Sequence, residues 1–136
     1  MPKLQPDRVA ETEKITINIG PVDLGRIDLL VREGFYSNRT DFIRSAIRTQ
    51  LSDQSQAVAQ SVARHRFEMG LYDVDRVALE ALRDAGEVMH LRVVGLARIA
   101  EDVPPELARE TIASLTVLGS LQASPAVKAA LKDRTT

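Results

Sequence analysis

The feature that most constrains this chain is an alternation near its start, KITINI at residues 14–19. Every second residue is isoleucine and the residues between are polar, which is the period of a strand with one buried face. The next stretch, GPVDLGRIDLLVREG, has the apolar spacing of a helix, so no partner strand follows. A lone strand leaves its backbone N–H and C=O groups unpaired. The sequence therefore predicts that this strand pairs with a strand from elsewhere.

Two helices are predicted directly after the strand. Gly20 and Pro21 suit the N-cap and the first helical position of the first helix, and Gly34 suits its C-terminal end. The second helix begins within FYSNRTDF, where we expect Asn38 as the N-cap, with Ser37 as the alternative.

A strand and two helices in about forty residues are too few to bury a core alone. Two copies solve both problems, because their strands can pair antiparallel across a two-fold axis while their apolar faces close on each other. The polar faces then line up outward, and a two-stranded ribbon has the width of the DNA major groove. The predicted dimer core consists of the apolar residues of the strand and both helices, namely Ile15, Ile17, Ile19, Leu24, Ile27, Leu30, Phe42, Ile43 and Ile47.

The stretch KITINIGPVDLGRIDLLVREGFYSNRTDFIRSAIRTQL resembles the ribbon-helix-helix (CopG-like) DNA-binding domain over residues 13–51. The similarity lies in the alternating KITINI, RID in the first helix, the G-x-x-S turn and the run RTDFIRSAIR. One departure is IGP, where the family usually has a proline directly after the last strand residue. The resemblance implies a homodimer that binds double-stranded DNA at an operator, with Lys14, Thr16 and Asn18 reading base edges. It also implies that the start of the second helix binds a phosphate, through Ser37, Asn38, Arg39 and Thr40.

The chemistry of the three polar ribbon residues agrees with that role. Lysine donates to guanine O6 or N7, asparagine makes a bidentate pair with adenine, and threonine hydrogen-bonds or contacts a thymine methyl group. The alternative is an ordinary surface ribbon with polar outer residues, and the pattern of the second helix favours DNA binding over it.

The rest of the chain contains a repeat. Three segments align on Gly70, Gly95 and Gly119, which lie 25 and 24 residues apart. Each glycine follows a short apolar run, and a leucine stands twelve residues after each of them. Helix-start signals lie between, at Asp73 or Asp75, at Pro104-Pro105 and at Ser124-Pro125. This pattern predicts three strand-helix units with parallel strands, similar to a short leucine-rich-repeat solenoid without its Asn ladder.

The predicted fold class is therefore α+β, with an N-terminal ribbon-helix-helix (β-α-α, an intertwined homodimer) followed by a small βα-repeat, solenoid-like domain. Residues 1–12 are expected to be a flexible arm, 13–51 the DNA-binding and dimerisation domain, and 52–64 a linker or an extension of the second helix. Leu51, Val58 and Val62 keep a helical spacing, which favours the extension. Residues 65–136 are expected to serve oligomerisation or effector sensing.

Composition narrows the classes of function. The chain has no Cys and only two His, His65 and His90, so we expect no metal site and no cofactor. No set of residues for catalysis can be assembled, and no apolar run is long enough for a membrane span. We expect a cytoplasmic, non-enzymatic transcriptional regulator, most simply a repressor. The alternatives are an antitoxin that regulates its own operon and a plasmid or DNA-processing accessory protein.

Overall fold

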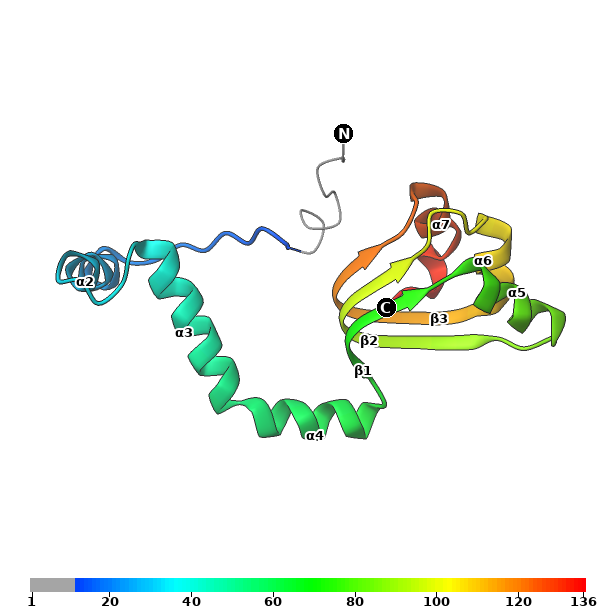
Figure 1. The fold of residues 1–136 in the computed structure, drawn as a ribbon, viewed down its shortest axis with the longest axis horizontal. Helices are drawn as coiled ribbons and strands as arrows, with labels where there is room; N and C mark the ends of the chain where they lie inside the picture. Colours follow the sequence, from blue (N-terminus) through cyan, green and yellow to red (C-terminus); the bar gives the residue numbers. More distant parts are fainter. Residues whose placement is uncertain (1–11) are drawn as a thin grey trace. The chain divides into compact units, whose positions relative to one another are not determined.

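The computed structural model describes residues 12–136, so nearly all of the arm expected at residues 1–12 lies outside the described residues. The chain is α+β and divides into two compact units, residues 14–61 and residues 62–136. The N-terminal unit is helical, and the C-terminal unit contains a three-stranded sheet (Figure 1).

In the N-terminal unit, both ends of α2 and the start of α3 lie at the residues that the sequence indicates. α2 spans Pro21–Arg32, with Gly20 as N-cap and Gly34 at a φ of 87° after its last turn. α3 spans Arg39–Asp53, and the side chain of its N-cap Asn38 accepts a hydrogen bond from the backbone N–H of Asp41. The predictions of Gly20 and Asn38 as N-caps are thus confirmed. α4, Ser55–His65, follows after Gln54, so residues 55–65 are helical.

Residues 12–20 form neither a helix nor a strand in the single chain. A strand is defined by its ladder, and the predicted partner of residues 14–19 is a second copy of the same segment. The β-α-α arrangement predicted for the N-terminal unit therefore stays a prediction.

The C-terminal unit alternates strands and helices. In chain order these are β1 (Glu68–Val74), α5 (Arg76–Asp84), β2 (Met89–Ile99), α6 (Pro105–Thr111), β3 (Ile112–Gln122), α7 (Pro125–Ala130) and a 3₁₀ turn, η1 (Lys132–Arg134). All neighbouring strands are parallel, in the order β1-β2-β3, which confirms the predicted parallel strand-helix units. The predicted helix starts are confirmed as well, since Asp75 caps α5, Pro105 begins α6 and Ser124 caps α7. The solenoid interpretation of the repeat stays a prediction.

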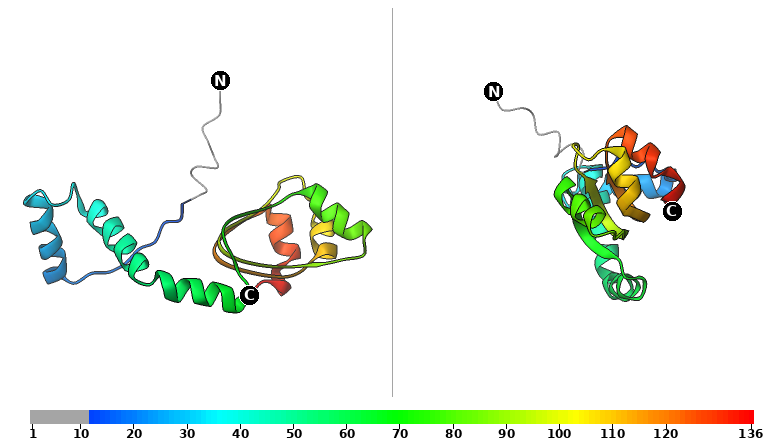
Figure 2. Two further views of the ribbon diagram at one scale, coloured as in Figure 1. Left: turned by 60° about the horizontal axis from the view of Figure 1, so that its bottom comes forward. Right: turned by 90° about the vertical axis from the view of Figure 1, so that its right-hand side faces the viewer.

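The three glycines of the repeat lie side by side across the sheet. Gly70 pairs with Gly95 and Gly95 with Gly119, and their φ angles are 116°, 137° and 123°. Such angles strongly favour glycine. A Cβ atom on Gly95 would lie 2.2 Å from the carbonyl oxygen of Gly70, and one on Gly119 would lie 2.1 Å from that of Gly95. The strands bend sharply along their course, and α6 and α7 lie in the hollow of this bend (Figure 2).

The core of the C-terminal unit lies between the sheet and these helices. Leu91, Val93, Ala97 and Ile99 point inward at alternate positions of β2, and Leu79, Leu107 and Val127 reach them from the helices. The intervening positions of β2, including Val94 and Leu96, belong to the other face of the sheet, which we call the outer face. The C-terminal unit thus has a hydrophobic core of its own.

Candidate nucleic-acid interface

The segment predicted to read DNA is exposed on all sides in the single chain. Lys14, Thr16 and Asn18 are exposed. So are the isoleucines between them, whose exposed fractions are 74% for Ile15, 64% for Ile17 and 42% for Ile19. Three large apolar side chains in a row on one side of an extended segment are unusual for a finished surface. This side of the segment is therefore suited to be covered.

The helices of the N-terminal unit do not close a core of their own. Of the residues predicted for the dimer core, Ile27 is buried in the single chain, Leu24, Leu30, Phe42 and Ile43 are half-buried, and Ile47 is exposed. Ile27 is also the one buried residue among positions 14–61. A shallow hollow of about 290 Å³, lined by Ile19, Asp23, Arg26, Ile27, Leu30 and Phe42, opens beside these side chains. The apolar residues converge, and they leave room for a further element.

The start of α3 is shaped as an anion site. The Asn38 side chain accepts from the backbone N–H of Asp41, and the Asp41 carboxylate accepts from the N–H of Ser37 at 2.9 Å. Among the described residues no acceptor is found for the backbone N–H groups of Arg39 and Thr40. These two groups lie in the first turn, at the positive end of a fifteen-residue helix. They are available to a phosphate.

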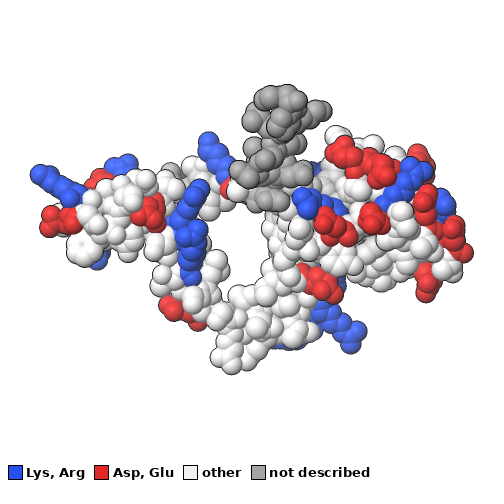
Figure 3. Space-filling model, viewed as in Figure 1, with Lys and Arg blue, Asp and Glu red and all other residues white. Residues whose placement is uncertain are grey.

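Two arginines extend this site along α3. A shallow pocket of about 370 Å³ is lined by Ser37, Asn38, Thr40, Asp41, Arg44 and Arg48. Thr40, Arg44 and Arg48 are four residues apart, so they share one face of the helix. Figure 3 shows basic side chains running along α3. Arg44 and Arg48 were not among the residues predicted for this site, although their spacing from Thr40 is a signal that identifies them.

The side chain of Arg39 is bound within the chain. Its Nε and Nη2 atoms donate to the two oxygens of Asp28, each at 2.8 Å, and so connect α3 to α2. The hydrogen bonds from Arg39 hold the pKa of the Asp28 carboxyl below its usual value, and Asp28 in turn raises the pKa of Arg39. Arg39 can therefore serve a phosphate through its backbone N–H, while its guanidinium orients the two helices.

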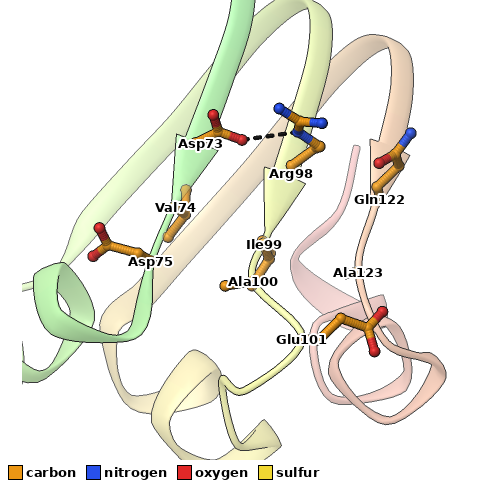
Figure 4. Close-up of a pocket in the computed structure, with 9 residues that line it drawn as sticks. All are labelled: Asp73, Val74, Asp75, Arg98, Ile99, Ala100, Glu101, Gln122 and Ala123. Atoms are coloured by element: carbon orange, nitrogen blue, oxygen red, sulfur yellow. Dashed lines mark hydrogen bonds and ion pairs between the residues drawn. The ribbon is translucent and has the colours of Figure 1, made fainter. Parts of the chain in front are cut away.

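The C-terminal unit has a cavity of about 500 Å³ where its three strands end. Figure 4 shows Asp73, Arg98 and Gln122 side by side on the three strands, with Asp75 and Glu101 beyond them. Asp73 accepts from Nε of Arg98 at 2.9 Å. No residue of this cavity was predicted as a site residue, although the carboxyl ends of parallel strands meet at one edge by topology.

The two histidines take part in local contacts. The His65 ring packs against Phe67, and His90 Nδ1 lies 2.7 Å from the Ser114 hydroxyl. Among residues 12–136 no group of three or more His, Asp or Glu residues is placed to hold a metal ion. Within the same range, no helix has the length and apolar character that crossing a membrane requires.

An exposed amphipathic segment, together with a helix start whose N–H groups can receive a phosphate, is typical of DNA-binding regulators. Comparison with protein families places the chain more closely. The chain belongs to the ribbon-helix-helix transcriptional regulator family, whose model matches residues 10–128 and thus covers both units. Membership implies DNA binding and dimerisation. No curated protein and no solved structure matches the chain.

Proposed function

We propose that this protein is a sequence-specific transcriptional repressor that binds a short palindromic operator as a homodimer. Residues 14–19 of two copies pair into an antiparallel ribbon that enters the major groove. Lys14, Thr16 and Asn18 of each copy then face the base edges, and the isoleucines between them close the dimer core.

The observation that carries this proposal is that a row of isoleucines is exposed in the single chain, although the chain belongs to a family that dimerises. Ile15, Ile17 and Ile19 are exposed in the single chain, and the hollow beside Ile27 and Phe42 is open. A second copy supplies both the missing ladder partner and the cover for these side chains. Burying them on one side leaves the three polar side chains on the other side.

The start of α3 supports a phosphate contact that positions the ribbon. The N–H groups of Arg39 and Thr40 and the positive end of the helix attract an anion, and Arg44 and Arg48 add charge on the same face. Such contacts set affinity and orientation without reading sequence.

The C-terminal unit bears on the alternatives. An antitoxin usually follows its DNA-binding module with a tail that folds on the toxin. Here thirteen buried apolar residues form a core within the C-terminal unit, so this part does not depend on a partner to fold. Oligomerisation or effector sensing suits such a unit better. A DNA-processing accessory role differs in where the protein binds, at one locus rather than at promoters.

The test is an electrophoretic mobility shift on a site selected from random duplexes. Replacing Lys14, Thr16 and Asn18 together by Ala should abolish the preference for the selected site, and Asn18→Ala alone should cost about 1–3 kcal/mol there. The comparison variant is Arg44→Gln/Arg48→Gln, which should lower the affinity for DNA of every sequence to the same extent. It should also reduce the slope of log K against log salt by about one for each lost phosphate contact. Undiminished site preference in the triple alanine variant would refute the proposal.

A further inference from the structure

The two edges of the C-terminal sheet differ in how they are covered. At the β3 edge, the backbone N–H of Thr136 donates to the carbonyl oxygen of Leu115 at 2.9 Å, and the guanidinium of Arg134 donates to the carbonyl oxygen of Ile112. The C-terminal residues thus cover the first residues of this edge. At the β1 edge, no backbone hydrogen bond is found on the side away from β2 among residues 12–136. The N–H and C=O groups on that side are a template for another strand.

The middle of this open edge is apolar. Met69 and Leu71, on the outer face of β1, are 64% and 54% exposed. Open edges are usually protected by charged side chains, a proline or a covering segment. In β1 the charges stand only near the ends, at Glu68 and Asp73, and the four residues between, MGLY, carry none. The edge therefore has the character of a strand that pairs.

A second copy of β1 is the occupant that the chain itself supplies. The family dimerises, so two C-terminal units are tethered to one dimer and their edges meet at a raised effective concentration. A two-fold axis normal to the sheet pairs identical strands in the antiparallel direction.

The bend of the sheet and the side chains select one register. Opposed residues of an antiparallel pair lie on the same face of the sheet. The axis therefore lies between two copies of the same residue, which face each other. An axis at Gly70 sets the two glycines opposite each other, continues the line of bends into the second copy, and places Met69 opposite Leu71 of that copy. An axis at Leu71 instead sets Met69 against the carboxylate of Asp73. Apolar contact favours the axis at Gly70 over the axis at Leu71, and only the axis at Gly70 sets the two bends opposite each other.

Charge agrees with the same register. With the axis at Gly70, Phe67 faces Asp73 of the second copy. The guanidinium of Arg92 lies 4.6 Å from the centre of the Phe67 ring and donates to the carbonyl oxygen of His65. The carboxylate of the second copy thus arrives beside a cation.

We propose that β1 is a homotypic sheet edge, on which β1 of a second copy pairs antiparallel about Gly70 and joins two three-stranded sheets into one. The inference rests on the proposed function in one respect, because dimerisation of the N-terminal unit brings the second copy close.

The chain contains no cysteine, so introduced cysteines report this contact without background. In the full chain, Met69→Cys/Leu71→Cys should form a covalent dimer under mild oxidation, because each cysteine faces the other position in the second copy. The matched control is Val77→Cys/Val88→Cys, whose positions are 74% and 52% exposed but lie away from β1. We expect the β1 pair to cross-link about tenfold faster or more. Equal rates, or no covalent dimer, would overturn the proposal.

Hydrogen exchange gives a second readout in the full chain. The β1 amides that point away from β2 should be protected, and Met69→Lys/Leu71→Lys should speed their exchange about tenfold or more by setting like charges opposite each other. Val77→Lys/Val88→Lys should leave them protected. Fast exchange of these outward-pointing amides in the unmutated protein shows that the β1 edge is open, and it overturns the proposal. An edge that instead pairs with a strand of a different protein gives the same fast exchange in the purified chain.

The ribbon variants separate this inference from the proposed function. The triple alanine variant at positions 14, 16 and 18 keeps the isoleucines, so cross-linking at β1 should persist while operator binding is lost. Cross-linking without any site-specific DNA binding in the unmutated protein refutes the proposed function alone. Site-specific binding without cross-linking refutes the β1 pairing alone.

Discussion

Arg39 and Asp28 show how a single contact divides the work among neighbouring residues. The guanidinium of Arg39 makes two hydrogen bonds of 2.8 Å to Asp28 and so spans α2 and α3. This ion pair engages the arginine that stands at the helix start, while no ion pair joins Arg44 or Arg48 to a carboxylate among the described residues. The contact that orients the helices and the proposed attraction of DNA thus belong to different arginines on one helix.

The Asp28–Arg39 pair predicts a specific pH dependence. Hydrogen bonding to Arg39 lowers the pKa of Asp28 in the folded protein, so the unfolded chain, with an Asp pKa of about 3.9, binds the proton more tightly. The stabilisation is therefore complete above that value and is lost as the pH falls through the folded pKa. Asp28→Asn should lower the urea midpoint of the N-terminal unit at neutral pH, and the difference from the unmutated chain should vanish in acid.

The control for this titration is Asp53→Asn, which removes a carboxylate from the other end of α3. Its difference from the unmutated chain should not follow the same pH course. A stability difference for Asp28→Asn that stays constant from neutral to acidic pH contradicts the interpretation.

Among the elements, the strands of the C-terminal unit were predictable because each contains a glycine that recurs at a near-constant spacing. Gly70, Gly95 and Gly119 recur at a near-constant spacing, and the structure pairs them across the sheet. The helix starts were predictable for a similar reason, since N-caps and first-turn prolines are local features. The bend that the glycines introduce was not, because a φ angle cannot be read from spacing.

The glycine line allows two substitutions to be compared. Gly70→Ala and Gly95→Ala both force alanine into a positive φ, which costs about 1–3 kcal/mol. At Gly95 the new methyl group also meets the carbonyl oxygen of Gly70 at 2.2 Å, whereas the space at Gly70 is open. Gly95→Ala should therefore lower the free energy of unfolding of the C-terminal unit more than Gly70→Ala does. Chemical denaturation followed by circular dichroism measures both, and equal losses would contradict a role for the backbone approach.

At the scale of the candidate site, the local cap was predictable from the sequence, whereas the contact between the two helices was not. The cap at Asn38 followed from local chemistry and is confirmed. The pairing of Arg39 with Asp28 joins residues eleven positions apart through long side chains, and no periodic pattern indicates it. The roles of Lys14, Thr16 and Asn18 stay predictions, since they depend on a ladder that forms only between two chains.

At the scale of the whole molecule, the two units differ in whether a single chain can form a hydrophobic core. The C-terminal unit buries thirteen apolar residues in its core, whereas Ile27 is the one buried residue among positions 14–61. The N-terminal unit therefore needs a second copy for its stability, and a family that dimerises provides one. In the proposed dimer, this half of the chain folds and the ribbon forms in the same event.

Ile17 tests that coupling directly. Its side chain is 64% exposed in the single chain, so Ile17→Ala should change little if the chain acts alone. In the ribbon dimer the same substitution removes a core side chain from each copy, at about 2–5 kcal/mol per site. Unfolding of α2 and α3, followed by circular dichroism at several protein concentrations, should shift to lower denaturant in the variant and depend on concentration in both proteins.

The control is Val22→Ala, at an exposed position in the first turn of α2, whose free energy of unfolding should stay within about 0.5 kcal/mol of that of the unmutated chain. If Ile17→Ala behaves like Val22→Ala, the isoleucine row is not the core of a dimer.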